Sequence, residues 1–412
     1  MTASLSAGGN RLPIIAKNSS YGKKTADIVI LDQQKENRLT TKTTLRRLDG
    51  IDLLRGLAIL FVLLNHVNMR LRIARIPYTN GIPDALVTLL VWNGQRAVQT
   101  FFAISGFLIT ATALRRWGAP GSVPPGEFYR LRIARIVPLL LALLAVLSAL
   151  HFLQVKNFVV QPKTGGIGRA LLAALTFRIN VLEATRGYLP ANWDILWSLS
   201  VEEVFYLCFP LACRFFGRTR ALVVLLIALV VMGPFALVIL ARGNEVWREY
   251  SYLGGMDAIA LGCLTGLIVH HRKSLERWSR GLAVAGAALL IFSFCFTRTA
   301  KEWGLTRSGL DMTVVALGAC MIAAASAQSH WTAPRALAPL LSLGRRSYEV
   351  YLTHMFVVFA LFELYLNTGK KPWGVPILFA TSILVAAFLG DIVARVYSEP
   401  MNQRLRKSEN HA

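Results

Sequence analysis

The chain has 412 residues, of which 54% are hydrophobic and only 16% are charged, and its mean hydropathy is +0.49. This composition is too apolar for a soluble protein of this length, so we expect the lipid bilayer to be part of its environment. The formal net charge is +23, and most Lys and Arg residues lie between the apolar stretches, where they can bind anionic lipid headgroups. The sequence lacks the basic stripe with interleaved aromatic residues that marks a nucleic-acid-binding domain.

The chain begins with a polar segment that is rich in Lys, Asn, Thr and Ser. Such a composition cannot bury a hydrophobic core, and the segment contains no apolar stretch of signal-peptide length. We therefore expect residues 1–47 to form a flexible cytoplasmic tail that is not cleaved. Residues 48–405 are expected to form one membrane domain, and residues 406–412 a short C-terminal tail.

Apolar stretches of helical length predict an all-α, polytopic bundle of about ten transmembrane helices. The predicted spans are 51–71, 97–114, 137–155, 195–216, 221–241, 252–271, 281–297, 310–327, 347–367 and 374–396. A further apolar stretch, 168–184, is short and is interrupted by Arg169 and Arg178, so we expect it to be re-entrant or interfacial. The five cysteines lie in apolar stretches without metal-ligand spacing, which predicts neither a zinc site nor a disulfide.

The distribution of Lys and Arg indicates how the spans cross the membrane. An even number of spans places both termini on one side, and if that side is the cytoplasm, 29 of the 45 Lys and Arg residues lie on it and 16 lie opposite. The positive-inside rule favours this orientation. Arg70, Arg72 and Arg75 are exceptions on the outer side, where they would either snorkel to the interface or meet an anionic neighbour.

The first span carries two polar residues, Arg55 and His66, in an otherwise aliphatic helix. Eleven steps of about 100° return nearly to the starting direction with a rise of about 16 Å, so both side chains face the same way about three turns apart. A shared polar face in a membrane helix predicts an interior, water-accessible cavity. The alternative for His66 is a hydrogen-bonded packing residue.

Two adjacent carboxylates, Glu202 and Glu203, lie in the fourth span. Ser198, Glu202 and Tyr206 are four residues apart and therefore share one stripe of the helix. One carboxylate is thus expected to face a cavity. Capping of the helix N-terminus by Ser and Glu is the alternative explanation.

Three further polar features are weaker: Ser105-Gly106 in the second span, Asp257 early in the sixth, and the run from Tyr348 to His354 in the ninth. A Ser-Gly pair in a membrane helix most often marks close helix packing. A single buried Asp often pairs with an Arg. None of the three predicts a function by itself.

Together, these motifs resemble acyltransferase family 3, a family of membrane O-acyltransferases, from about residue 48 to 405. In chain order the motifs are LDGIDLLR (48–55) followed by His66, FFAISGFLIT (101–110), FYRLRIARIVP (128–138), WSLSVEEVFY (197–206), the stretch from Leu343 to His354, and Glu399-Pro400.

The sequence departs from the pattern of this family in two places. Gly255 replaces the Arg that many members carry before the Asp, and the chain ends soon after the last helix, without the esterase-like domain of some relatives. We expect transfer to be completed by the membrane domain or by another protein.

The resemblance implies transfer of an acyl group, usually acetyl, from acyl-CoA to a hydroxyl of a glycan or glycosylated small molecule at the bacterial inner membrane. It implies that His66 is the general base and that Glu202 orients it or stabilises the imidazolium, or that His66 carries a transient acyl group. Coenzyme A, a polyanionic co-substrate, would be held by four arginines and one serine: Arg55, Arg130, Arg132, Arg135 and Ser105. The supporting residues are Asp52, Trp197, Ser198, Glu203, Tyr206, Asp257, Tyr348 and His354.

The expected partners are membrane lipid and the acceptor, without a metal. A transporter or flippase of a polar or anionic solute is the competing function, because intramembrane Arg, His, Asp and Glu also line solute and proton paths. A structural or sensing membrane protein is a third possibility. Transporters often consist of two similar halves, and the sequence shows no such repeat.

The topology can be tested with reporter fusions. Because most basic residues lie on the side of the two termini, a C-terminal green fluorescent protein should fluoresce, and a C-terminal alkaline phosphatase should be inactive. The opposite pair of results would place the termini outside.

Overall fold

The computed structural model describes residues 48–407, apart from 219 and 241–242. Within these ranges the chain folds into helices without a strand, and ten helical segments are long and apolar enough to cross a membrane. The predicted all-α, ten-span bundle is therefore confirmed. The predicted tail at 1–47 lies outside the described residues, as do positions 408–412 of the short C-terminal tail.

Ten long helices supply the candidate spans. They are α2 (Asp49–Ile73), α4 (Gly94–Trp117), α5 (Pro125–Phe152), α8 (Leu196–Phe216), α9 (Ala221–Leu240), α11 (Tyr252–His271), α12 (Ser279–Cys295), α15 (Leu310–Gln328), α17 (Ser347–Asn367) and α18 (Gly374–Val393). Helix α18 continues through a π-helical turn, η6 (Ala394–Ser398), into α19 (Glu399–Lys407). The main shorter helices are α3 (Asp84–Val91), α6 (Gly166–Leu175), α7 (Ile179–Arg186), α10 (Glu245–Tyr250) and α16 (Ala338–Arg345).

Local sequence explains where these helices begin and end. Asp49 and Asp52 lie in the first turn of α2 and Arg70 in its last turn, which complements the helix dipole at both ends. Helix α4 is followed by Gly118, which has a positive φ of 79° that glycine adopts without steric strain. Helix α5 starts with Pro125. Proline is tolerated in the first turn of a helix because the backbone N–H groups there have no partner within the helix.

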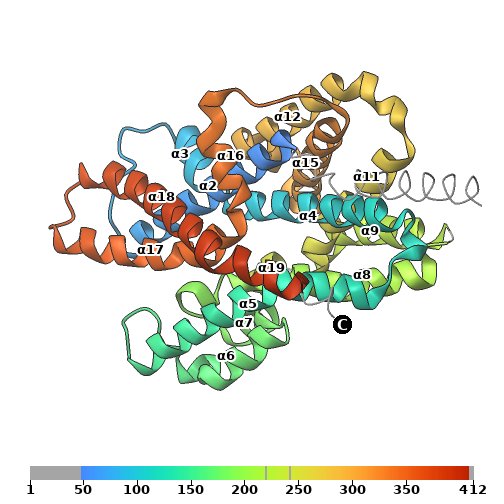
Figure 1. Ribbon diagram of the computed structural model, residues 1–412. Helices are drawn as coiled ribbons and strands as arrows, with labels where there is room; N and C mark the ends of the chain where they lie inside the picture. The colour runs from blue at the N-terminus through green and yellow to red at the C-terminus, as the bar shows by residue number, and fades with distance from the viewer. Residues whose placement is uncertain (1–47, 219, 241–242, 408–412) are drawn as a thin grey trace, which may run out of the picture. The chain divides into compact units, whose positions relative to one another are not determined.

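Helices α4 and α8 form the centre of the bundle. In the most apolar window of each helix, 72% of the α4 residues and 67% of the α8 residues are buried, compared with 11% for the α12 segment. Helix α4 packs against α2, α11 and α15, and it crosses the middle of the helices in Figure 1. The polar residues of α4 and α8 consequently lie inside the protein, whereas α12 offers most of its surface to lipid.

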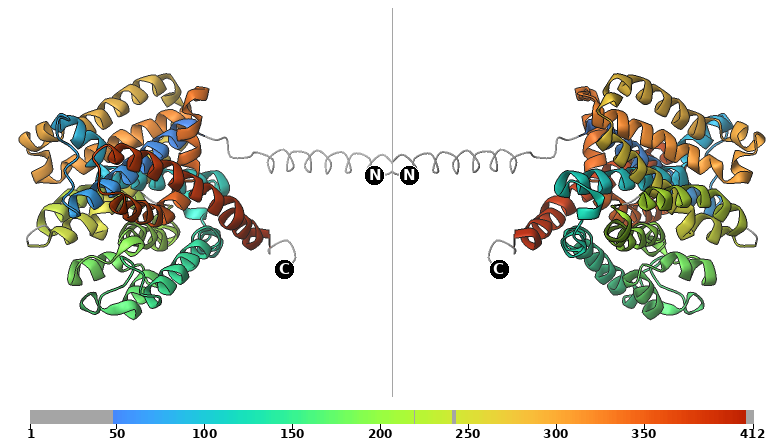
Figure 2. Two further views of the ribbon diagram at one scale, coloured as in Figure 1. Left: turned by 90° about the vertical axis from the view of Figure 1, so that its left-hand side faces the viewer. Right: turned by 90° about the vertical axis from the view of Figure 1, so that its right-hand side faces the viewer.

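The apolar stretch predicted at 168–184 forms two short helices, α6 and α7. Neither is long enough to cross a bilayer. Helix α6 packs against α5 and α7, and the two short helices lie at one edge of the helices in Figures 1 and 2. The segment closes one side of the α8 N-terminus, since α7 also contacts α8.

Glycines allow two pairs of helices to approach backbone to backbone. A Cβ atom on Gly106 of α4 would lie 1.9 Å from the Ile259 carbonyl oxygen of α11. A Cβ atom on Gly344 of α16 would lie 1.8 Å from the Asp52 carbonyl oxygen of α2. Small residues at such crossings are typical of membrane helices, so the Ser105-Gly106 pair does mark close packing.

We predict that Gly106→Ala destabilises the protein by about 1–3 kcal/mol, because the methyl group meets backbone atoms that can move only with their helix. Gly281→Ala is the matched control, since a Cβ atom there has no neighbour within 4 Å. Thermal unfolding in one detergent measures both. Equal unfolding midpoints for the two variants would show that α4 and α11 can move apart to admit the methyl group without loss of stability.

Candidate active site

Glu202 is the centre of a polar cluster between α4 and α8. The Ser105 hydroxyl and the Tyr206 hydroxyl both donate to Glu202 Oε1, and the two hydroxyls also contact each other. Tyr206 is one turn beyond Glu202, as the predicted stripe requires. A carboxylate that accepts two hydroxyl hydrogen bonds can remain ionised in an apolar bundle.

Arginines from two helices surround this cluster. The Arg132 guanidinium of α5 lies 3.4 Å from the centre of the Tyr206 ring, a cation–π contact. It also interacts electrostatically with Glu202 and Glu203. Arg55 of α2 interacts with Glu202 in the same way and repels Arg135. Three of the four predicted CoA-binding arginines, Arg55, Arg132 and Arg135, therefore converge near the glutamates, whereas Arg130 has an exposed side chain.

His66 contacts Val62 and His354, whereas the sequence analysis expected Glu202 as its partner. Its Nδ1 lies 2.8 Å from the Val62 carbonyl oxygen and 3.4 Å from Nε2 of His354. Nδ1 of His354 lies 2.6 Å from the Tyr351 carbonyl oxygen. Among the described residues, no hydrogen bond joins His66 to Glu202, because the Glu202 stripe of α8 points to Ser105 of α4 and not to α2.

This arrangement assigns the tautomers of both rings from the hydrogen-bond network. Nδ1 of each histidine faces a backbone carbonyl, which can only accept, so each Nδ1 carries the hydrogen. Nε2 of His354 then accepts from Nδ1–H of His66. The lone pair of His66 is left on Nε2, the atom that can take a proton from a substrate.

Tyr351 connects the histidine pair to α8. Its hydroxyl lies 2.7 Å from the Ser198 hydroxyl and 3.1 Å from the Ile195 carbonyl oxygen, to which it donates. The predicted residue Tyr348 donates to the Ile136 carbonyl of α5 at 3.1 Å. Helix α17 thereby ties the predicted residues of α2, α5 and α8 together.

Asp52 lies in the first turn of α2 and is bound by a residue of α16. Nε of Arg345 donates to Asp52 Oδ2 at 3.3 Å, and Asp52 also interacts with Arg55. The sequence analysis did not single out Arg345 as a partner, although it lies within a quoted motif. The pair fixes the orientation of the first turn of α2, from which Arg55 projects.

Asp257 has neutral partners in place of an arginine. Its Oδ1 accepts from the Gln99 amide at 2.9 Å, and its Oδ2 accepts from Thr313 at 3.3 Å. Gly255 has no room for a side chain, since a Cβ atom would lie 2.5 Å from the Phe102 ring and 2.9 Å from Val201. The sequence did not lead to Gln99, although an amide side chain near the start of an apolar span is a usable signal.

Trp197 belongs to a separate aromatic and acidic cluster at the start of α8. Its ring stacks on Tyr250 with centroids 4.2 Å apart and planes 5° apart, and the Tyr250 hydroxyl donates to Asp194 at 3.2 Å. Glu183 is fully buried nearby and accepts from the Leu189 N–H at 2.9 Å. Burial, reinforced by the charge of Asp194, raises the pKa of Glu183 well above its usual value.

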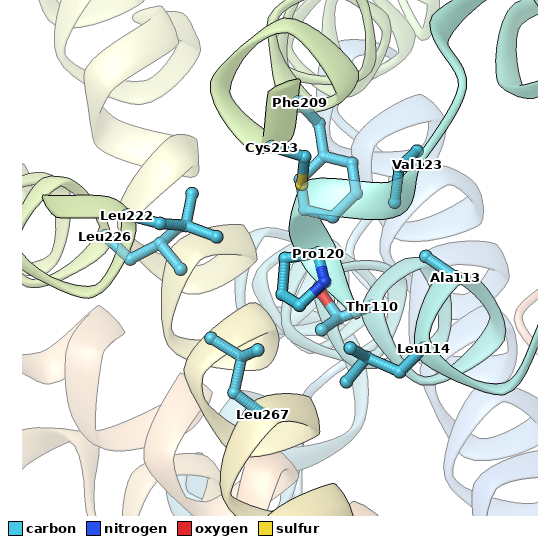
Figure 3. A pocket seen from close by; sticks show the side chains of 10 residues that line it. All are labelled: Thr110, Ala113, Leu114, Pro120, Val123, Phe209, Cys213, Leu222, Leu226 and Leu267. Carbon is cyan, nitrogen blue, oxygen red and sulfur yellow. The ribbon is translucent and has the colours of Figure 1, made fainter. Parts of the chain in front are cut away.

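A small apolar hollow lies between the ends of α4, α8, α9 and α11. Figure 3 shows that apolar side chains such as Leu222, Leu226 and Leu267 point into it, with Thr110 as a hydroxyl at its edge. None of the predicted site residues lines this hollow. The chemistry of the polar residues therefore places the candidate site between α2, α4, α5, α8 and α17.

We predict that Ser105→Ala and Tyr206→Phe are not additive. Each removes one donor to Glu202, so their combined effect on stability should differ from the sum by about 0.5–3 kcal/mol. Ser293→Ala combined with Tyr206→Phe is the control, because the Ser293 hydroxyl donates to Leu289 of its own helix at 2.8 Å and should be additive. Unfolding midpoints of the purified variants provide the comparison, and full additivity in both cycles would argue against a shared cluster.

Comparison with known proteins identifies the family of this chain. The chain is 24% identical over 397 residues to O-acetyltransferase OatA of Staphylococcus aureus, covering 91% of this chain and 60% of the relative. It is 26% identical over 365 residues to peptidoglycan O-acetyltransferase OatA of Listeria monocytogenes, covering 84% and 55%. The chain thus spans little more than half the length of these relatives, and no solved structure matches it. Residues 48–391 match the acyltransferase domain of acyltransferase family 3, and the chain belongs to this family.

Proposed function

We propose that this protein is a membrane-embedded O-acetyltransferase that moves an acetyl group from acetyl-CoA to a hydroxyl of a glycan or glycosylated small molecule. Family membership supports acyl transfer, and the names of the two relatives support acetyl as the group and peptidoglycan as one example of an acceptor. The observation that carries the proposal is the His66 ring, whose tautomer leaves the lone pair on Nε2 available to take a proton, on the same face of α2 as Arg55.

The donor is assigned to the arginine cluster. Coenzyme A carries a diphosphate and a ribose phosphate, and guanidinium groups bind phosphate through paired, charge-assisted hydrogen bonds. Arg55, Arg132 and Arg135 lie together on the side of His66 that is nearer to Leu48, where α2 begins and α5 starts. Because the sequence predicts that this side is cytoplasmic, the cluster would meet coenzyme A where the cell supplies it.

The reaction follows from the tautomer. His66 Nε2 accepts the proton of the acceptor hydroxyl while the oxygen attacks the thioester carbonyl. As the carbon–sulfur bond breaks, the imidazolium returns this proton to the leaving thiolate, so atoms and charges balance. His354 accepts a hydrogen bond from Nδ1–H of His66 and thereby stabilises the imidazolium, the role that the sequence analysis gave to Glu202. Glu202 instead holds Ser105 and Tyr206 in place beside Arg132.

Variants of α2 separate binding from chemistry. His66→Ala should leave the affinity for acetyl-CoA nearly unchanged and reduce the transfer rate by about two to four orders of magnitude, because the base is lost. Arg55→Ala should instead weaken donor binding by about 1.5–3 kcal/mol, the cost of losing a charge-assisted hydrogen bond to phosphate. His270→Ala, at the exposed end of α11, is the control for loss of a histidine.

Donor affinity and transfer of labelled acetyl should be measured on all three variants in the same detergent. Transfer by His66→Ala at the wild-type rate would make His66 a packing residue and would favour a transporter. Glycan masses from cells with and without the gene would show the acceptor as the species that loses an acetyl-sized increment.

A further inference from the structure

Arg70 lies one turn beyond His66 on the same face of α2, which we call the reaction face because it carries His66. Residues four apart on a helix share a face with Cβ atoms about 6 Å apart. The Arg70 guanidinium lies 4.4 Å from the centre of the Phe359 ring and 5.7 Å from that of Phe362. These rings are only 5% and 3% exposed, so the guanidinium points into the interface between α2 and α17 and away from lipid.

Among the described residues, the acidic group that interacts with Arg70 is Glu363, and its carboxylate already has two hydrogen-bond donors. Glu363 interacts with Arg70 only at longer electrostatic range. Its Oε2 accepts from Lys156 at 3.1 Å and its Oε1 from Asn157 at 3.0 Å. Within the described ranges, Arg70 forms no ion pair or hydrogen bond, and its Nε is buried without a partner. A guanidinium in such surroundings gains strongly from an anion.

The position of Arg70 indicates which anion it would meet. The proposed donor-binding residues Arg55, Arg132 and Arg135 all lie on the other side of His66, nearer to the start of α2. The acceptor must therefore approach Nε2 of His66 from the side of Arg70. We propose that Arg70 binds a negative charge of the acceptor, a carboxylate or phosphate close to the hydroxyl that is acetylated. This inference rests on the proposed acetyl transfer and narrows its acceptor to anionic glycans.

Arg72 provides a matched comparison within the same helix. It carries the same charge at the same end of α2 and also contacts an aromatic ring, with its guanidinium 4.8 Å from the Trp92 centroid. Two residues along a helix, however, turn the side chain by about 200°. Arg72 is exposed, so it suits contact with a lipid headgroup and not with the reaction face.

The test uses two sugars that differ by one charge. N-acetylmuramic acid is N-acetylglucosamine with a lactyl ether that adds a carboxylate and leaves the hydroxyls at C4 and C6 free. The full chain in phosphatidylcholine nanodiscs is given labelled acetyl-CoA and either sugar, and kcat/KM is obtained from the acetylated product by mass spectrometry. The affinity for each sugar without donor is measured in the same preparation.

Wild-type protein and Arg72→Gln should prefer N-acetylmuramic acid in both measurements. Arg70→Gln should lose about 10- to 100-fold with this sugar, as expected for one charge-assisted hydrogen bond. It should be unchanged with N-acetylglucosamine and in its donor affinity. Arg70→Lys, which keeps the charge without the planar fork, should recover part of the preference.

Other outcomes overturn specific parts of the inference. Equal losses with both sugars, or no preference in the wild-type protein, would show that Arg70 does not read the charge of the acceptor. A difference between wild type and Arg70→Gln that arises only in phosphatidylglycerol nanodiscs would assign Arg70 to a lipid headgroup. If neither sugar is acetylated, the proposed function fails in this assay, while the two binding affinities still decide whether Arg70 recognises the anion.

Discussion

A carboxylate inside an apolar helix bundle needs protein hydrogen-bond donors in place of water, and this need at Glu202 determines how the site is built. Ser105 of α4 and Tyr206 of α8 both donate to one oxygen of Glu202. Arg132 of α5 then lies against the Tyr206 ring. Three helices must meet in one register to satisfy this single group, and the same register brings the arginines together.

The polar contacts depend in turn on close backbone packing. Gly106 follows Ser105 directly, so the turn of α4 that delivers a hydroxyl to Glu202 is also the turn that presses against the backbone of α11. At the other end of the site, Gly344 packs against the Asp52 carbonyl while the next residue, Arg345, binds the Asp52 side chain. In both places one short sequence combines a glycine for approach with a polar side chain for orientation.

The fold and part of the site could be predicted from the sequence, and the physical reason differs between them. The ten spans follow from hydropathy, because a bilayer demands long apolar helices. The stripe of Ser198, Glu202 and Tyr206 follows from helix periodicity, which is a local property. The pairing of His66 with His354 could not be predicted, since these residues are far apart in the sequence and the pairing depends on how α2 and α17 rotate against each other.

The same limit explains why the partners of Glu202 and Asp257 could not be predicted. Glu202 was expected to orient His66, but its stripe meets Ser105 of α4 instead, which periodicity alone does not reveal. Gly255 left the partner of Asp257 undetermined, and the structure shows that Gln99 of α4 donates a hydrogen bond to it. A polar residue in an apolar span thus shows that a partner exists, and only the tertiary structure shows which one.

The packing around Gly255 also constrains how this chain can diverge from its relatives. Phe102 and Val201 fill the space that a side chain at position 255 would need, so an arginine could be introduced there only together with smaller residues at positions 102 and 201. Gln99 would then be redundant as the partner of Asp257. A sixth span that carries an arginine at position 255 would therefore clash with α4 and α8 of this chain, whereas α4, α8 and α11 exchanged as one unit keep their mutual fit.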